Sequence, residues 1–269
     1  MKKIFRTPLQ HYGASSKTRK PLVRRSKASS IPFEGIIRLN RYLAHAGLAS
    51  RREADELIKS GVIQVNGKVI SELGHKILPT DQVKFDGRYL SPEKKVYILL
   101  NKPKGFITTT QDEKGRKTVM NLVSKAPSCR IYPVGRLDRQ TTGVLLLTND
   151  GDLANKLTHP KNQVKKVYHV VLDKKVKSSD LEKIRKGVYL SEGKAIVDTV
   201  SYVQGSPKNE LGLELHIGWN RVVRRIFETL GYEVDKLDRV SLGGFTNKNV
   251  KRGQWRTLTQ KEIIFLKML

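Results

Sequence analysis

The sequence lacks the residues that several common chemistries require. Its single cysteine, Cys129, cannot form an internal disulfide, which agrees with a reducing compartment. The six histidines stand far apart, without the paired spacing of metal ligands, so we expect no metal site. The sequence has no Walker phosphate loop, dinucleotide fingerprint or Gly-x-Ser-x-Gly elbow, so ATP-driven, redox and serine-hydrolase chemistry are disfavoured.

Long apolar runs are also missing. No run approaches the roughly 20 residues that span a bilayer, and no apolar stretch follows the first basic residues as in a secretory signal. The hydrophobic share of 38% and the charged share of 29% are typical of a soluble globular protein. We therefore expect a cytoplasmic protein without a membrane partner, and 269 residues suit two domains.

Acidic residues are scarce relative to basic ones. There are 52 Lys and Arg against 25 Asp and Glu, a net charge of +27. This balance indicates a polyanionic partner, with nucleic acid as the first candidate. An anionic membrane surface is the competing interpretation, but no long helix combines a basic face with a bulky apolar face. Residues 1–35 are basic and aperiodic, which predicts a disordered arm that either contacts phosphates or only aids solubility.

Residues 36–92 are predicted to form a small α+β module that binds RNA. Ser50 followed three residues later by Glu53 is typical of a helix capping box, and a first helix precedes it. Asn66-Gly67 and Asp86-Gly87 predict two β-hairpins. Arginines stand near the helix starts, where they can bind phosphate; a solvated basic face is the alternative. These arginines are Arg38, Arg41, Arg51 and Arg52.

Residues 93–269 are predicted to form a larger domain in which strands outnumber helices. Because the two do not alternate regularly, we expect an α+β fold with a mixed, mostly antiparallel sheet. Strands are expected at 96–100, 144–148, 167–172, 196–203, 211–217 and 237–242. Helices are expected at 151–158, 179–186 and 220–230, the last capped by Asn220.

The stretch GRLDRQTTG places Asp138 between Arg136 and Arg139, just before an apolar strand. A carboxylate at the rim of a sheet is well placed for function, and nearby positive charge favours its ionised, nucleophilic form. The same arginines can bind a phosphodiester. Taken locally, a simple pairing of Asp138 with Arg136 or Arg139 is the better interpretation.

Two further segments carry candidate functional residues. Lys166-Val167-Tyr168 alternates as a strand does, so Tyr168 either faces a pocket as acid, base or stacking platform, or belongs to the core. Arg221, Arg224 and Arg225 fall together at helical spacing, where they repel one another unless an anion such as RNA phosphate or Asp138 lies between them; a solvated basic face is the alternative.

These motifs resemble those of the ribosomal-RNA pseudouridine synthases of the RsuA and RluB group. The similarity lies in Gly135–Gly151, in Asn101–Gly105, in Lys166–Tyr168 and in Asn220–Arg225. Residues 36–84, with Arg38–Leu43, Ala49–Ala54 and Val65–Lys68, resemble the RNA-binding module named after ribosomal protein S-four. The order of the two domains is also that of the group.

The resemblance implies isomerisation of uridine within RNA, without cofactor or metal. It implies that Asp138 forms a covalent adduct, that Tyr168 stacks on the flipped uracil, and that Arg224 pairs with Asp138. It also implies that Arg136 fills the gap left by the extruded nucleotide. We expect the remaining RNA contacts from Arg139, Arg221, Arg225, Lys102 and the module arginines given above.

Two positions depart from the group's usual third motif: Trp219 stands in place of a lysine and Val222 in place of a glutamine. The local RNA contacts therefore cannot be carried over. We expect a monomeric enzyme whose partner is ribosomal RNA, more specifically the large-subunit RNA, or a ribosomal subunit precursor. The alternatives are a noncatalytic RNA-binding assembly factor on the same scaffold and a glycosidase of free nucleosides.

Overall fold

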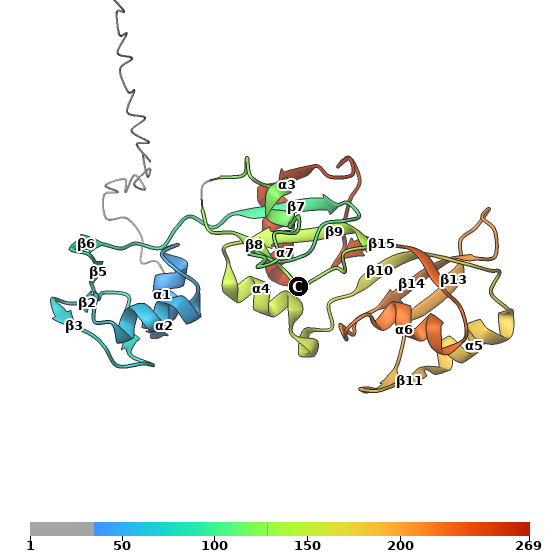
Figure 1. Ribbon diagram of the computed structural model, residues 1–269, viewed down its shortest axis with the longest axis horizontal. Coiled ribbons are helices and arrows are strands. Elements are labelled where there is room, and N and C mark those ends of the chain that lie inside the picture. The colour runs from blue at the N-terminus through green and yellow to red at the C-terminus, as the bar shows by residue number, and fades with distance from the viewer. Residues whose placement is uncertain (1–34, 128) are drawn as a thin grey trace, which may run out of the picture.

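The computed structural model describes residues 35–127 and 129–269 (Figure 1). The predicted basic arm, residues 1–35, falls outside these ranges except for its last residue. No helix within the described ranges is long and apolar enough to cross a membrane.

The first part of the described chain is a small module of two helices and short strands. Ser50 and Glu53 form the predicted capping box of the second helix. Both predicted hairpins are present, because Asn66-Gly67 and Asp86-Gly87 adopt the left-handed backbone that a tight two-residue turn needs. One sheet has the strand order β3-β2-β5-β6, and β1 pairs with β4. The elements are β1 (Ile37–Arg38), α1 (Leu39–His45), α2 (Arg51–Lys59), β2 (Ile63–Val65), β3 (Lys68–Val69), β4 (Lys76–Ile77), β5 (Val83–Phe85) and β6 (Arg88–Tyr89).

Polar contacts join this module to the rest of the chain. Arg41 on α1 forms an ion pair of 2.5 Å with Asp152 on α4 (Gly151–Thr158). Glu53 and Arg130 form a second ion pair at 3.5 Å.

His45, at the end of α1, is also affected by the rest of the chain. Burial, with the neighbouring positive charge of Lys95, lowers the pKa of His45 to about 4. The module therefore lies beside α4 at one end of the molecule (Figure 1).

A nine-stranded sheet forms the centre of the larger domain. Its main path is β13-β14-β10-β15-β9-β7-β17, with β8 beside β9 and β16 beside β15. Only the pairing of β15 with β9 is parallel among the described strands of this sheet, so the predicted mixed, mostly antiparallel sheet is confirmed. The strands are β7 (Tyr97–Lys102), β8 (Tyr132–Pro133), β9 (Thr142–Thr148), β10 (Lys166–Leu172), β13 (Thr199–Tyr202), β14 (Glu210–Leu215), β15 (Val234–Leu242), β16 (Phe245–Thr246) and β17 (Trp255–Thr257).

The two halves of the sheet have separate cores. Helices α5 (Ser178–Lys186) and α6 (Val222–Thr229) pack on β10, β13 and β14. Strands β7 and β9 are covered on both faces, by α4 and α7 (Gln260–Met268) on one and by α3 (Val119–Leu122) on the other. Double coverage explains why β9 is apolar at every position of the run 144–147.

The structure also contains elements that the sequence did not predict. The helix at 151–158 is confirmed residue for residue, whereas the strand at 196–203 is shortened to β13. The unpredicted elements are β1, β4, α3, α7, β8, β16, β17, the 3-10 helix η1 (Pro160–Asn162) and the hairpin of β11 (Val188–Leu190) with β12 (Gly193–Ala195). Most are two to four residues long, too short to show a period.

Gly143 lies where strand β9 passes close to the backbone of β15. It pairs with Lys102 on β7 and with Arg239 on β15, and its φ is +109°. A Cβ at this position would lie 2.2 Å from the carbonyl oxygen of Arg239. The centre of the sheet therefore requires glycine here.

We predict that Gly143→Ala lowers the free energy of unfolding by roughly 3 kcal/mol or more, because both backbone strain and a backbone clash result. Gly212→Ala is the matched control, since a Cβ there meets nothing nearer than 3.9 Å and no positive φ is involved. Urea denaturation of both variants measures the difference. Equal stability of the two variants would contradict the argument.

Candidate active site

A cavity of about 610 Å³ opens between the two halves of the sheet. Its walls are the loop 134–141, the end of α4, strands β10 and β15, and the loop 216–221 that leads into α6. Among the described residues that line it, Asp138 is the only carboxylate. The cationic residues lining it are Arg136, Arg139, Lys166, Arg221 and Arg239.

The loop that carries Asp138 is fixed from below by Lys102. The side chain of Lys102 has no solvent exposure, and its Nζ donates to the carbonyl oxygens of Asp138 at 3.0 Å and Thr141 at 2.8 Å. Burial lowers the pKa of Lys102 to about 8. Lys102, which we expected to contact RNA, is buried in this structure, and its ammonium group holds the loop backbone.

Further hydrogen bonds hold the same loop at its other positions. The hydroxyl of Thr108 donates to the carbonyl of Leu137 at 2.7 Å and accepts from its N–H. The N–H of Gly105 donates to the carbonyl of Arg139 at 2.8 Å. The backbone around Asp138 is thus held on both sides while 34% of its side chain stays exposed to the cavity.

The arginine nearest Asp138 is not the predicted one. Arg221 Nη1 lies 3.9 Å from Asp138 Oδ2, whereas Arg224 donates from Nη1 to the carbonyl of Val234 at 2.7 Å. Arg224 forms no ion pair within 4.0 Å among the described residues, so the expected pair with Asp138 is not formed in this structure. The charge of Asp138 does favour the ionised form of Arg224, although burial is the larger effect and lowers its pKa.

The backbone at the start of α6 explains why Arg221, and not Arg224, lies nearest Asp138. Asn220 was expected to cap the helix, but Arg221 occupies that position with φ +49° and without a side-chain cap, and the helix begins at Val222. A left-handed backbone is unusual for a residue with a long side chain. Arg221 is therefore turned toward the cavity while Arg224 is buried under the helix.

The other clustered arginines also have protein partners. Arg225 forms two hydrogen bonds of 2.7 Å with the carboxylate of Glu192, next to the turn of the β11–β12 hairpin. The predicted contact of Arg225 with RNA would require breaking this pair. Arg41 is held in the same way by Asp152.

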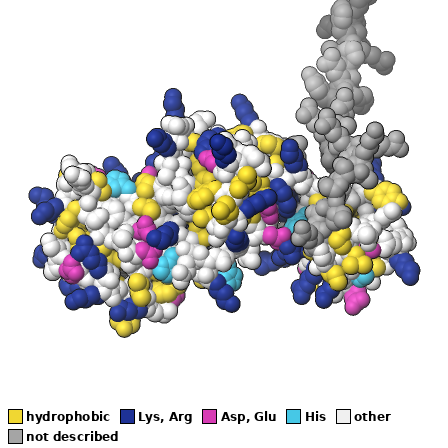
Figure 2. Space-filling view, turned by 180° about the vertical axis from the view of Figure 1, so that it is seen from behind, with side chains coloured by type: hydrophobic (Ala, Val, Ile, Leu, Met, Phe, Trp, Pro, Cys, Tyr) yellow, Lys and Arg dark blue, Asp and Glu magenta, His cyan; other side chains and the backbone are white. Residues whose placement is uncertain are grey.

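The remaining predicted RNA contacts are exposed. Arg136 lies at the cavity with no ion pair among the described residues, and Arg139 donates to the carbonyl of Gly105 at 3.3 Å. Arg38, Arg51 and Arg52 are exposed on the N-terminal module. Figure 2 shows that Lys and Arg side chains are spread over the visible face and are not confined to one end.

Tyr168 lies on β10, and its ring lines the cavity although only 9% of the residue is exposed. Lys166, two residues earlier, donates to the carbonyls of Val164 and His216 at 2.9 and 2.7 Å. Burial, with the positive charge of Arg239, lowers the pKa of Lys166 to about 8. The predicted sharing of one face by Lys166 and Tyr168 is consistent with both lining the cavity.

Arg239 was missed by the sequence analysis. It is 3% exposed, its Nε donates to the carbonyl of Val144 at 2.8 Å, and its buried Nη2 has no hydrogen-bond partner among the described residues. An arginine inside the strand predicted at 237–242 was the available signal. With Lys102 and Lys166 it forms a layer of positive charge beneath the cavity.

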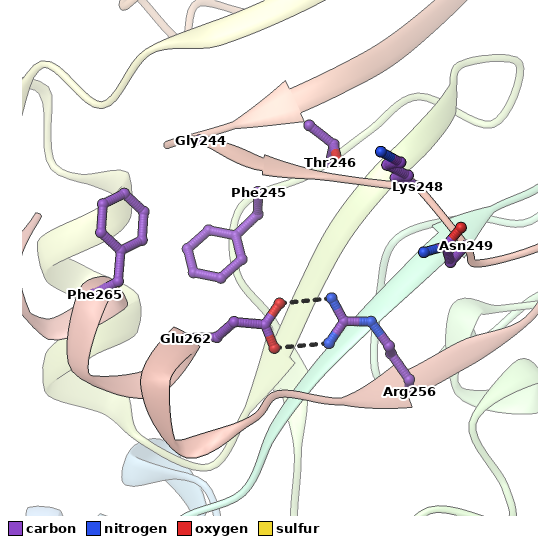
Figure 3. Close-up of a pocket in the computed structure, with 8 residues that line it drawn as sticks. All are labelled: Gly244, Phe245, Thr246, Lys248, Asn249, Arg256, Glu262 and Phe265. Atoms are coloured by element: carbon purple, nitrogen blue, oxygen red, sulfur yellow. Dashed lines mark hydrogen bonds and ion pairs between the residues drawn. The ribbon is translucent and has the colours of Figure 1, made fainter.

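A second hollow lies beside α7 and contains none of the predicted site residues (Figure 3). Its charged side chains Arg256 and Glu262 form a two-point ion pair, with bonds of 2.6 and 2.8 Å. No group of three or more His, Cys, Asp or Glu that could hold a metal ion occurs within residues 35–127 and 129–269.

The chain belongs to the RNA pseudouridylate synthase family, whose model matches residues 96–229; an S4 domain model matches residues 37–83. It is 43% identical to the ribosomal large subunit pseudouridine synthase B of Bacillus subtilis, covering 86% of this chain and 96% of that one. It is 37% identical to the dual-specificity RNA pseudouridine synthase RluF of Escherichia coli, covering 86% and 78%. A crystal structure of a pseudouridylate synthase matches with a TM-score of 0.61 and 27% identity, covering 86% of this chain and 99% of that chain.

We predict that Lys102→Met lowers the rate of pseudouridine formation by roughly 10- to 100-fold, because the loop carrying Asp138 loses its anchor. Single-turnover kinetics with saturating enzyme measure the rate. Lys104→Met is the control, because Lys104 is an exposed lysine two residues away. Full activity of Lys102→Met in folded protein would rule out the anchoring role.

We predict that the stability of the wild type relative to Lys166→Met increases as the pH rises from about 8 to about 10. The pKa of Lys166 is lowered to about 8 in the folded chain, so within this window the unfolded chain holds a proton that the folded chain has released. Raising the pH therefore removes the cost of the buried charge. Urea denaturation of both proteins across this range tests the sign; a constant or falling difference would contradict it.

Proposed function

We propose that the chain converts specific uridines of ribosomal RNA, in particular of the large subunit, to pseudouridine, with Asp138 as the nucleophile. The observation that carries this is the position of Asp138: it is the one carboxylate among the described residues lining a cationic cavity, on a loop anchored by a buried lysine. The names of the Bacillus subtilis and Escherichia coli relatives support an RNA substrate, and the former supports the large subunit.

The reaction exchanges one bond of the ribose for another. The uridine first leaves the RNA stack and enters the cavity, where Tyr168 provides a stacking surface. Asp138 forms a covalent adduct with the ribose or the base while the bond between N1 of uracil and C1′ of ribose breaks. The base turns, C5 bonds to C1′, and the bond to Asp138 breaks, which regenerates the free carboxylate. C5 releases its proton, and N1 gains one. Substrate and product are isomers, so nothing is oxidised or reduced.

Charged groups around the cavity serve distinct purposes in this scheme. Arg221, 3.9 Å from Asp138, and the buried layer of Lys166 and Arg239 keep the cavity positive, which attracts the phosphates on either side of the target. Exposed Arg136 is placed to fill the gap that the flipped nucleotide leaves. In this scheme the positive charge of Arg224 acts on Asp138 electrostatically, over a distance, and not by direct contact.

We further propose a division into an RNA-binding domain at 36–92 and a catalytic domain at 93–269. Exposed Arg38, Arg51 and Arg52 support RNA binding by the first domain. We place the activity in the cytoplasm, acting as a monomer on ribosomal RNA or on a precursor of the ribosomal subunit.

We predict that Asp138→Asn abolishes release of tritium from ribosomal RNA labelled at C5 of uracil, because an amide cannot form the adduct. RNA affinity is expected to stay within a few-fold, since the cations of the cavity remain. Asp235→Asn, at an exposed position of β15, is the control and should keep full activity. If the wild type releases no tritium from any ribosomal transcript but binds RNA, the chain is a noncatalytic RNA-binding factor.

A further inference from the structure

Trp219 is an aromatic residue in a cavity otherwise rich in cations. It lies in the loop between β14 and α6, lines the same cavity as Asp138, and packs in part against the core beneath α6. Its ring reaches the β11–β12 hairpin, where a Cβ on Gly193 would lie 3.9 Å from Cη2. Trp219 therefore forms the edge of the cavity on the side of the hairpin.

The environment of Trp219 differs from that of a tryptophan serving only the core. A buried tryptophan usually donates its indole N–H to a partner, but Trp219 makes no such hydrogen bond with the described residues. Its ring is half-buried, with one part on the core and another part on the cavity. The indole lines the same cavity as Arg221 and Arg136, so the cavity combines a stacking plane with positive charge, the pairing that binds unstacked bases.

We propose that Trp219 stacks on the base of a nucleotide flanking the target uridine and so contributes to the choice of target. This inference rests on the function proposed above. The target base belongs deeper in the cavity, with Asp138 and Tyr168, whereas Trp219 stands at the edge. The adjoining hairpin has exposed Lys194 and exposed Tyr189. An RNA strand that leaves the cavity on this side therefore meets a further positive charge and a second aromatic ring.

Stacking has a different salt signature from phosphate binding. Each lysine or arginine that pairs with phosphate adds to the slope of log affinity against log salt, whereas a stacked ring does not. Loss of the Trp219 ring should therefore weaken binding equally at all salt concentrations. Loss of a stacked aromatic side chain weakens binding by roughly 5-fold or more.

Intrinsic fluorescence gives a direct test, because the sequence contains only two tryptophans, Trp219 and Trp255. Trp255→Phe leaves Trp219 as the sole emitter, and Trp219→Phe leaves Trp255, which packs against the core on β17. The probe is the shortest transcript fragment of large-subunit ribosomal RNA from which the wild type releases tritium. We expect this fragment to quench the first protein and not the second.

Two substitutions separate stacking from packing. Trp219→Phe keeps a ring and should bind this RNA within about three-fold of the wild type, whereas Trp219→Leu keeps only apolar bulk and should bind roughly 5-fold more weakly or worse, with an unchanged salt slope. An unquenched Trp219 together with wild-type affinity of Trp219→Leu would overturn the inference.

If the proposed function is wrong, the experiment gives a different set of results. In that case the wild type releases no tritium from any fragment, and the same titration is made with the fragment that binds most tightly. Quenching there would keep Trp219 as an RNA-stacking residue, and absence of quenching would reject both ideas.

Discussion

The Lys102 ammonium group lies without solvent exposure beneath the loop that presents Asp138, and the active-site geometry depends on this contact. Its hydrogen bonds to the carbonyls of Asp138 and Thr141 join β7 to the start of β9. Gly143 permits β9 to lie close to β15, the strand from which Arg239 reaches the cavity. A buried charge is costly, and here backbone carbonyl groups compensate it. The result is a carboxylate held at a fixed position.

Positive charge around Asp138 is arranged in two layers. Lys102 and Arg239 are buried below Asp138, and Lys166 beside them is half-buried, so solvent screens the field of this layer little. Arg136 and Arg221 lie on the exposed side of the cavity, where bound RNA can replace the water around their side chains. Several arginines that sequence spacing assigned to RNA are neutralised within the protein, such as Arg225 by Glu192. Net charge thus indicates the class of partner but not which side chains meet it.

Local rules predicted much of this structure. The capping box at Ser50 and the turns at Asn66-Gly67 and Asp86-Gly87 depend on neighbouring residues alone, and all are present. The motif around Asp138 also located the site by its sequence. Contacts between distant segments could not be predicted in this way. No local pattern indicates the carbonyl groups that Lys102 and Arg224 contact, because these belong to other loops and strands. Arg221, and not the predicted Asn220, is the N-cap residue of α6. Its backbone is left-handed, a conformation that the conformational preferences of arginine disfavour.

We propose that Asp138 in this cavity carries out the isomerisation of uridine in large-subunit ribosomal RNA. The most direct measurement is the mapping of pseudouridines at single-nucleotide resolution in a full-length large-subunit transcript incubated with wild-type protein or with Asp138→Asn. We expect new pseudouridine at one or a few defined positions with the wild type and none with the variant. The same positions modified by both proteins, or no modification by either, would contradict it.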